Sequence, residues 1–220
     1  MALIEIGARA PRFVLADQHG EFHDFKDFAG RIVVLYFYPK DDTSGCTAEA
    51  CQFRDHHPDF SKLKGTVVGI SPDDVVSHGK FDRKHALGFT LLADPPGPDG
   101  TPRTCDAYGV WSKKSMYGRS YMGVVRTTYL IGPDGRVAAR WDRVQVPAHA
   151  AEVLAAARAL HSGVDVKAAK GEAKRGKLKG GSKVSRVERL KTHRSSRTTR
   201  SKDSDPPFKP VRGLRSAGIT

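Results

Sequence analysis

A cysteine that follows a buried-type strand is the residue in this 220-residue sequence that could most directly do chemistry. Cys46 ends the segment PKDDTSGC, which places it in the first turn of a predicted helix. Unpaired backbone N–H groups and the positive end of the helix dipole favour a thiolate there. Because the thiolate is the nucleophilic form of cysteine, we expect Cys46 to be a reactive thiol.

Three other residues could complete a small site around Cys46. Gly45 lets the backbone come close to a small substrate. The Thr43 hydroxyl, three residues before the sulfur, can point into the same pocket. Arg126, on a later predicted strand, is a candidate cation that would hold the anion more firmly.

Two of the nearby charges have roles that the sequence leaves open. Arg126 could instead be a strand-surface arginine that pairs with a carboxylate. Glu49 could orient Arg54 or Arg126, or its charge could simply favour the helix N-terminus.

The elements that must position Cys46 are a strand and the helix after it. The continuous apolar run 32–38 predicts a central strand covered on both faces, and Pro39 ends it. Thr43 or Ser44 offers an N-cap for a helix that runs on through residue 53. Pro58 is expected to kink or split that helix.

The other predicted elements alternate between strands and helices. They are an opening hairpin (13–15 with 21–23), strands at 66–71, 89–92, 124–131 and 136–141, helices at 73–87 and 147–160, and a Pro- and Gly-rich loop at 95–102. This order, with one antiparallel pair near the end, predicts an α/β domain of three layers around a mixed central sheet.

The formal net charge of +13 is concentrated in the last part of the chain. Residues 161–220 hold 17 Lys and Arg against 5 Asp and Glu, a net of +12, so the rest of the chain is almost neutral. Like charges mixed with Gly, Ser and Thr cannot bury enough surface to offset the entropy of ordering. We therefore expect a folded domain at 1–161 and a disordered basic tail at 162–220.

Two interpretations of this tail remain open. It could be a solvating extension without a partner, or it could attach weakly to nucleic acid through counterion release, in a strongly salt-dependent way. Phe208 is its only aromatic residue, so it lacks a stacking platform for single strands.

The chain carries no sign of export or membrane insertion. No apolar run approaches the roughly 20 residues of a membrane helix, and the N-terminus lacks the basic start and apolar block of a signal peptide. We expect a cytoplasmic protein. Three cysteines are too few for a disulfide framework, so a disulfide between two of them would be transient and catalytic.

The residues around Cys46 resemble a known family. Pro39, Thr43 and Cys46 fit the P-x-x-x-T-x-x-C signature of peroxiredoxins. The longer run YPKDDTSGCTAEACQFRD is similar to the bacterioferritin-comigratory-protein subfamily, also called peroxiredoxin Q. The likeness spans roughly residues 5–160 and includes GVVRTTYLIGPDGRV, in which Arg126 stands where the active-site arginine of the family is expected.

The resemblance implies a thioredoxin-like fold and an antioxidant enzyme that reduces hydrogen peroxide and organic hydroperoxides. Cys46 would be the peroxidatic thiolate, and Cys51 would resolve its sulfenic acid as an intramolecular disulfide. Thr43 and Arg126 would be catalytic, with Pro39 and Gly45 in the substrate pocket. Thioredoxin or a similar dithiol would recycle the enzyme. The resemblance implies no metal or organic cofactor, and a monomer or weak dimer.

The implied disulfide has a geometric condition. Five residues along an α-helix give a rise of about 7.5 Å and a rotation of about 140°, which puts the two Cα atoms roughly 8 to 9 Å apart. That separation exceeds the range of a disulfide, so a bridge between Cys46 and Cys51 requires the first turns of the helix to unwind. Cys105 is expected to be a bystander, with a role as an alternative resolving thiol left open.

Other protein classes fit the sequence less well. A redox sensor or DNA-associated protector could use the same thiol, and its difference from an enzyme would be the lack of steady-state turnover. A general thiol–disulfide oxidoreductase would want Cys-x-x-Cys, which the sequence lacks. Four residues separate Cys46 from Cys51 and no second Cys or His pair stands at zinc spacing, so we expect no metal site.

Overall fold

The computed structural model describes residues 2–116 and 118–164. The tail predicted at 162–220 therefore lies almost entirely outside the described residues. Among the residues described, no helix combines the length and the apolar character needed to span a bilayer.

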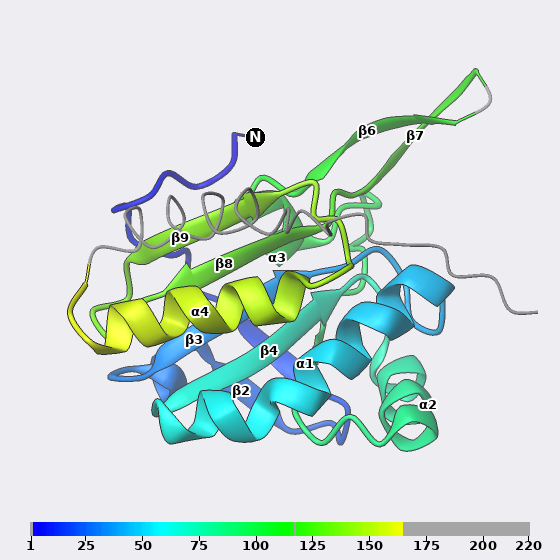
Figure 1. Cartoon of the computed structure of the whole chain (residues 1–220). Coiled ribbons are helices and arrows are strands. Elements are labelled where there is room, and N and C mark those ends of the chain that lie inside the picture. The colour runs from blue at the N-terminus through cyan, green and yellow to red at the C-terminus, as the bar shows by residue number, and fades with distance from the viewer. Residues whose placement is uncertain (1, 117, 165–220) are drawn as a thin grey trace, which may run out of the picture. The chain divides into compact units, whose positions relative to one another are not determined.

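A seven-stranded mixed sheet forms the middle of the domain (Figure 1). Its strands are β1 (Val14–Asp17), β2 (Phe22–Asp24), β3 (Ile32–Phe37), β4 (Gly65–Ser71), β5 (Thr90–Ala93), β8 (Thr127–Ile131) and β9 (Val137–Asp142), in the order β2-β1-β5-β4-β3-β8-β9. Strands β3, β4 and β5 are parallel neighbours, whereas β1, β2, β8 and β9 pair antiparallel. The predicted opening hairpin and the antiparallel pair near the end are both confirmed.

Strand β3 lies inside this sheet because both of its faces are apolar. All six of its residues are buried. Since side chains alternate along a strand, Val34 and Tyr36 join one core cluster while Leu35 and Phe37 join the other. The strand thus leads the chain through the centre of the domain and delivers it to the loop before Cys46.

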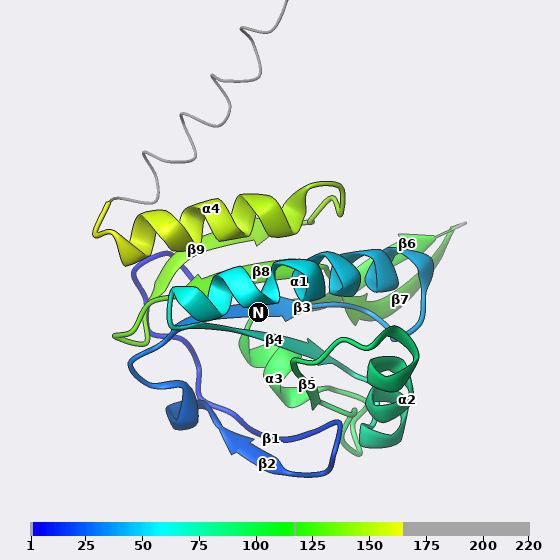
Figure 2. The same ribbon diagram turned by 60° about the horizontal axis from the view of Figure 1, so that its bottom comes forward.

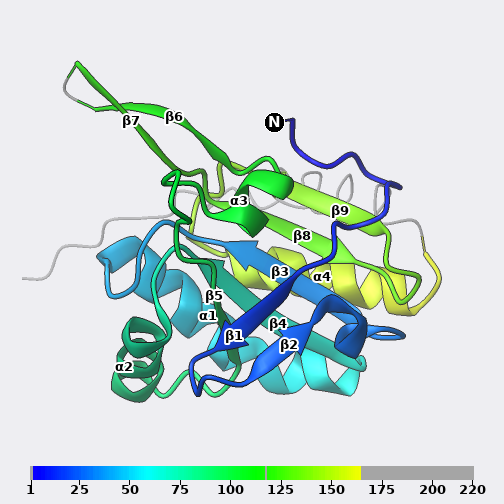
Figure 3. The same cartoon turned by 180° about the vertical axis from the view of Figure 1, so that it is seen from behind.

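Helices cover both faces of the sheet. On one face lie α1 (Ser44–Lys62), α2 (Val75–His85) and α4 (His149–His161), which share one core cluster. Figure 1 shows α1 and α4 in front of the strands, and α2 lies at the lower right. Figure 2 shows α4 above the strands. On the other face lie the short α3 (Arg103–Ala107), the 3₁₀ turn η1 (Phe25–Phe28) and the N-terminal segment, seen from behind in Figure 3. The three-layer α/β architecture predicted from the sequence is confirmed.

Pro58 was expected to kink or split the helix after Cys46, and the structure contradicts the split. Helix α1 runs without interruption from Ser44 to Lys62 and contains Pro58. A proline removes one N–H donor from the helix interior. Phe53 and Phe60, on either side of it, are fully buried, and their packing holds both halves of the helix on the sheet.

The sequence also mispredicted the segment around Arg126. Instead of one strand over 124–131, the chain forms a hairpin of β6 (Trp111–Met116) with β7 (Arg119–Val124), and β8 begins only at Thr127. Strand β7 pairs with β6, which projects from the domain in Figures 1 and 3, whereas β8 pairs with β3. Arg126 therefore lies in the connection where the chain changes from one sheet to the other.

Candidate active site

Cys46 lies in the first turn of α1, as predicted. Thr43 is the N-cap residue with an extended backbone, but its side chain makes no capping hydrogen bond. The first bond of the helix runs from the Thr47 N–H to the Thr43 carbonyl at 2.8 Å. Within the described residues, the N–H groups of residues 44–46 have no acceptor, so the helix start presents free donors next to the sulfur.

The guanidinium of Arg126 reaches across to Cys46. Its Nη2 donates to Cys46 Sγ at 3.1 Å, and its Nη1 forms an ion pair with Glu49 Oε2. A Cβ built on Gly45 would lie 3.4 Å from Arg126 Nη2, so this glycine packs closely against the guanidinium. The sequence left open whether Glu49 orients Arg54 or Arg126, and in the structure its partner is Arg126. Arg54 instead pairs with the adjacent Asp55.

Burial and charge act in opposite directions on Glu49 and on Arg126. Burial raises the pKa of Glu49 to about 7, although Arg126 lowers it, and Glu49 Oε1 has no hydrogen-bond partner in the described part of the chain. Burial also lowers the pKa of Arg126, but Glu49 and Cys46 outweigh burial and leave that pKa above its ordinary value. The guanidinium therefore stays charged beside the sulfur.

Thr43 and Pro39 lie on the exposed side of the same loop. Thr43 Oγ1 donates to the Lys40 carbonyl at 3.1 Å, and no hydrogen bond joins it to Cys46 in the described residues. Because its proton is directed at Lys40, the hydroxyl oxygen can still accept a hydrogen bond. Cys46 itself is only 1% exposed, so only a narrow group can approach its sulfur.

The other two cysteines differ in their relation to Cys46. Cys51 is half-buried on α1, and all three thiols are free. Since α1 is continuous from Cys46 to Cys51, its first turns must unwind before these two cysteines can form a disulfide. Cys105 is buried in the core cluster on the opposite face of the sheet, and burial, with Asp94 beside it, raises its pKa well above the usual range.

Sequence reasoning missed a buried polar network next to this site. It joins Asp41, two residues before Thr43, to Tyr38 and to Ser77 and His78 on α2. Tyr38, which the apolar pattern marks only as a strand residue, donates to Asp41. Nothing in the local sequence pairs Asp41 with a histidine 37 positions later.

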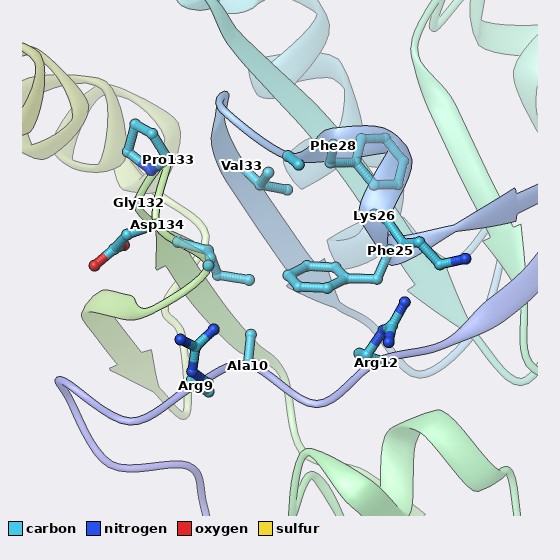
Figure 4. Close-up of a pocket in the computed structure, with 13 residues that line it drawn as sticks. Arg9, Ala10, Arg12, Phe25, Lys26, Phe28, Val33, Gly132, Pro133 and Asp134 are labelled. Carbon is cyan, nitrogen blue, oxygen red and sulfur yellow. The ribbon is translucent and has the colours of Figure 1, made fainter.

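A hollow of about 380 Å³ lies away from Cys46, near the start of β3 (Figure 4). Phe25, Phe28 and Val33 contribute its apolar wall, and Arg9 and Arg12 lie at its rim (Figure 4). None of the residues that line it belongs to the Cys46 site, so it does not bear on the chemistry of the thiol.

A thioredoxin-like domain that holds a cysteine at a helix start, between free N–H groups and an arginine, defines a class of thiol-dependent redox enzymes. The comparisons with known proteins narrow this class. The AhpC/TSA family matches residues 6–140. Peroxiredoxin Bcp of Bacillus subtilis is 46% identical over 151 residues, covering 69% of this chain and 93% of the relative. Peroxiredoxin Bcp of Escherichia coli is 38% identical over 151 residues, covering 69% and 94%.

A solved structure with a similar fold indicates the same group of proteins. It is that of the bacterioferritin comigratory protein of Xanthomonas campestris, described for its alkyl peroxide reduction activity. It is 37% identical, with a TM-score of 0.62, and the match covers 68% of this chain and 92% of that one. The chain therefore belongs to the AhpC/TSA family, in its Bcp or peroxiredoxin Q group, and is a thiol peroxidase.

Proposed function

We propose that Cys46 is the peroxidatic cysteine of this enzyme and that Cys51 is its resolving cysteine. The observation that carries the proposal is the position of Cys46 Sγ, 3.1 Å from Arg126 Nη2 and beside the free N–H groups at the start of α1. Both features stabilise an anion at the sulfur and a developing negative charge on a bound oxygen.

In the first step, the Cys46 thiolate attacks the terminal oxygen of a hydroperoxide. The S–O bond forms as the O–O bond breaks, so Cys46 becomes a sulfenic acid while the substrate leaves as an alkoxide, or hydroxide from hydrogen peroxide, and takes up a proton. Thr43 Oγ1 would accept the hydrogen bond of the peroxide O–H, and Arg126 would stabilise the leaving charge. Pro39 and Gly45 would shape the narrow approach.

In the second step, the Cys51 thiol condenses with the sulfenic acid and releases water. A dithiol then reduces the Cys46–Cys51 disulfide by thiol–disulfide exchange and is itself oxidised. Thioredoxin or a similar protein fits this role. The substrate class is hydrogen peroxide and organic hydroperoxides, in keeping with the alkyl peroxide reduction described for the Xanthomonas relative.

The proposal extends to the surroundings of the enzyme. The enzyme would be a monomer or a weak dimer. It would work in the cytoplasm, where dithiol proteins that can reduce it are present. The tail predicted at 162–220 would be separate from the domain at 1–161 and would make at most a weak, salt-dependent contact with nucleic acid, as its positive charge suggests.

Two cysteine variants test the assignment. We expect Cys46→Ser to abolish peroxide consumption, because the nucleophile is lost. Cys51→Ser should consume one equivalent and stop with a sulfenic acid, which mass spectrometry detects after trapping with dimedone. Full steady-state turnover of Cys51→Ser with thioredoxin would assign resolution to another thiol, and turnover by Cys46→Ser would overturn the proposal.

A further inference from the structure

Asp41, in the loop that leads to Cys46, is a buried side chain with three hydrogen-bonding side chains around its carboxyl group. It is only 6% exposed. The Tyr38 hydroxyl donates to Oδ1 at 2.7 Å. Ser77 Oγ and His78 Nδ1, both from α2, lie 2.8 Å from Oδ2. Two hydroxyl groups and one ring nitrogen thus surround this carboxyl group and hold it in place.

His78 is fully buried and faces an acceptor on each side of its ring. Nδ1 lies 2.8 Å from Asp41 Oδ2, and Nε2 lies 3.2 Å from the Leu92 carbonyl on β5. A neutral imidazole has only one N–H, so it could donate to only one of these two oxygens. The ring therefore donates to Asp41 when its proton is on Nδ1, and Nε2 then has no proton for the Leu92 carbonyl.

The backbone of the same loop is held as well. The Asp41 N–H donates to Asp73 Oδ2 at 2.8 Å, and Asp73 also accepts from Ser71 at the end of β4. Asp42 makes a more exposed contact with α2, through Lys84 and His85. The loop before Cys46 is thus tied to β4 and α2, and only the Asp41 attachment is shielded from water.

We propose that His78 is a positioning residue of the Cys46 site. The N–H of its Nδ1 holds Asp41, which fixes the loop that supplies Thr43 and the start of α1. His78 makes no hydrogen bond with Cys46, Thr43 or Arg126 in the described residues; it acts through the placement of the loop. The inference rests on the proposed function, because it assumes that Cys46 is the thiol that reacts.

Two substitutions at this position separate positioning from simple packing. In His78→Asn the amide nitrogen stands close to the place of Nδ1, so the donor to Asp41 is kept and the contact with Leu92 is lost. In His78→Gln the amide nitrogen corresponds to Nε2, so the contact with Leu92 is kept and the donor to Asp41 is lost. The two variants have similar polarity, and neither carries an imidazole ring.

The second-order rate constant for hydrogen peroxide, measured by stopped flow, reads out the position of the loop. We expect His78→Gln to lower it roughly ten-fold or more, since small misplacements of reacting groups cost this much. His78→Asn should stay within about three-fold of wild type. Asp42→Asn, which removes the charge only from the exposed contacts of the same loop, is the matched control and should leave the rate unchanged.

Three results would overturn the role of His78. One is equal rate constants for the Gln and Asn variants, and another is a slower Asn variant, since either would mean that the rate follows packing against β5. The third comes from the wild-type protein, in which long-range ¹H–¹⁵N NMR should find a proton on Nδ1 of His78; a ring protonated at Nε2 alone contradicts the bond to Asp41 even where a variant fails to fold.

The test keeps the two proposals apart. Turnover by Cys46→Ser would defeat the proposed function whatever the His78 variants do. An inactive Cys46→Ser together with a wild-type rate constant for His78→Gln would defeat only the positioning role.

Discussion

At the scale of residues, the helix start and Arg126 both place positive potential next to the Cys46 sulfur, and they are held in different ways. The free N–H groups at the start of α1 are fixed by the backbone, whereas the Arg126 guanidinium is fixed by its ion pair with Glu49. Glu49 is itself almost completely buried, so it holds the arginine at the cost of its own solvation. A change at Arg126 and a change at Glu49 therefore have different consequences.

Arg126→Ala should slow the reaction with peroxide. We expect the second-order rate constant to fall roughly 100-fold, because removal of one donor to a developing anion has an effect of this order. Stopped-flow kinetics with hydrogen peroxide measures it. Arg119→Ala, which removes an exposed arginine from the neighbouring β7, is the control and should react like wild type. An unchanged rate constant for Arg126→Ala would remove this residue from the site.

Glu49 should make the stability of the reduced protein depend on pH. Its pKa is about 7 in the folded state against an ordinary value of 4.5. Between these values the folded protein binds a proton that the unfolded chain does not, so this group's contribution to the free energy of unfolding is present below about 4.5 and is lost as the pH rises to about 7.

Urea unfolding at pH 5, 6 and 7 measures this dependence. In the wild-type protein, the free energy of unfolding should fall as the pH rises through this range. In Glu49→Gln it should fall less, because glutamine keeps the shape of the side chain and does not titrate. Identical pH dependence in the two proteins would mean that Glu49 is ionised throughout this range.

At the scale of elements, α1 must do two opposite things. It must be helical to present Cys46 to Arg126, and its first turns must open for Cys46 and Cys51 to meet. Opening breaks the ion pair between Glu49 and Arg126 and exposes buried side chains. Phe53, fully buried one turn beyond Glu49, marks the point where we expect the opening to stop.

Hydrogen exchange on the oxidised protein tests this opening. After one equivalent of peroxide, amide exchange should rise across residues 44–52 and the far-UV helical signal should fall. The amides of α4, which packs on α1, are the internal control and should keep their protection. An oxidised protein with a Cys46–Cys51 disulfide and an unchanged α1 would contradict the geometry.

The same elements show what the sequence could predict. Local signals located β3, the start of α1 and Cys46, because an apolar run, a proline and a capping residue act over a few positions. Contacts between distant segments could not be predicted from local signals. Arg126 lies between β7 and β8 because the chain changes sheets there, and α1 continues through Pro58 because residues on both sides of it pack on the sheet. The pairing of Asp41 with His78 is of this second kind.

At the scale of the whole molecule, the domain and the basic tail should be separable. Removal of residues 165–220 takes away 17 Lys and Arg and leaves every residue of the Cys46 site in place. We expect peroxide turnover to be unchanged, and retention on DNA at low salt to fall to the level seen at high salt. Equal retention at low salt with and without the tail would contradict a contact with nucleic acid.

The central claim, that Cys46 reacts and Cys51 resolves, is tested most directly by mass spectrometry of the wild-type protein after one equivalent of peroxide. Peptide mapping without reduction should find Cys46 joined to Cys51 within one chain and Cys105 as a free thiol. A disulfide from Cys46 to Cys105 or between two chains, or a Cys46 that stays a sulfenic acid while Cys51 remains free, would contradict it.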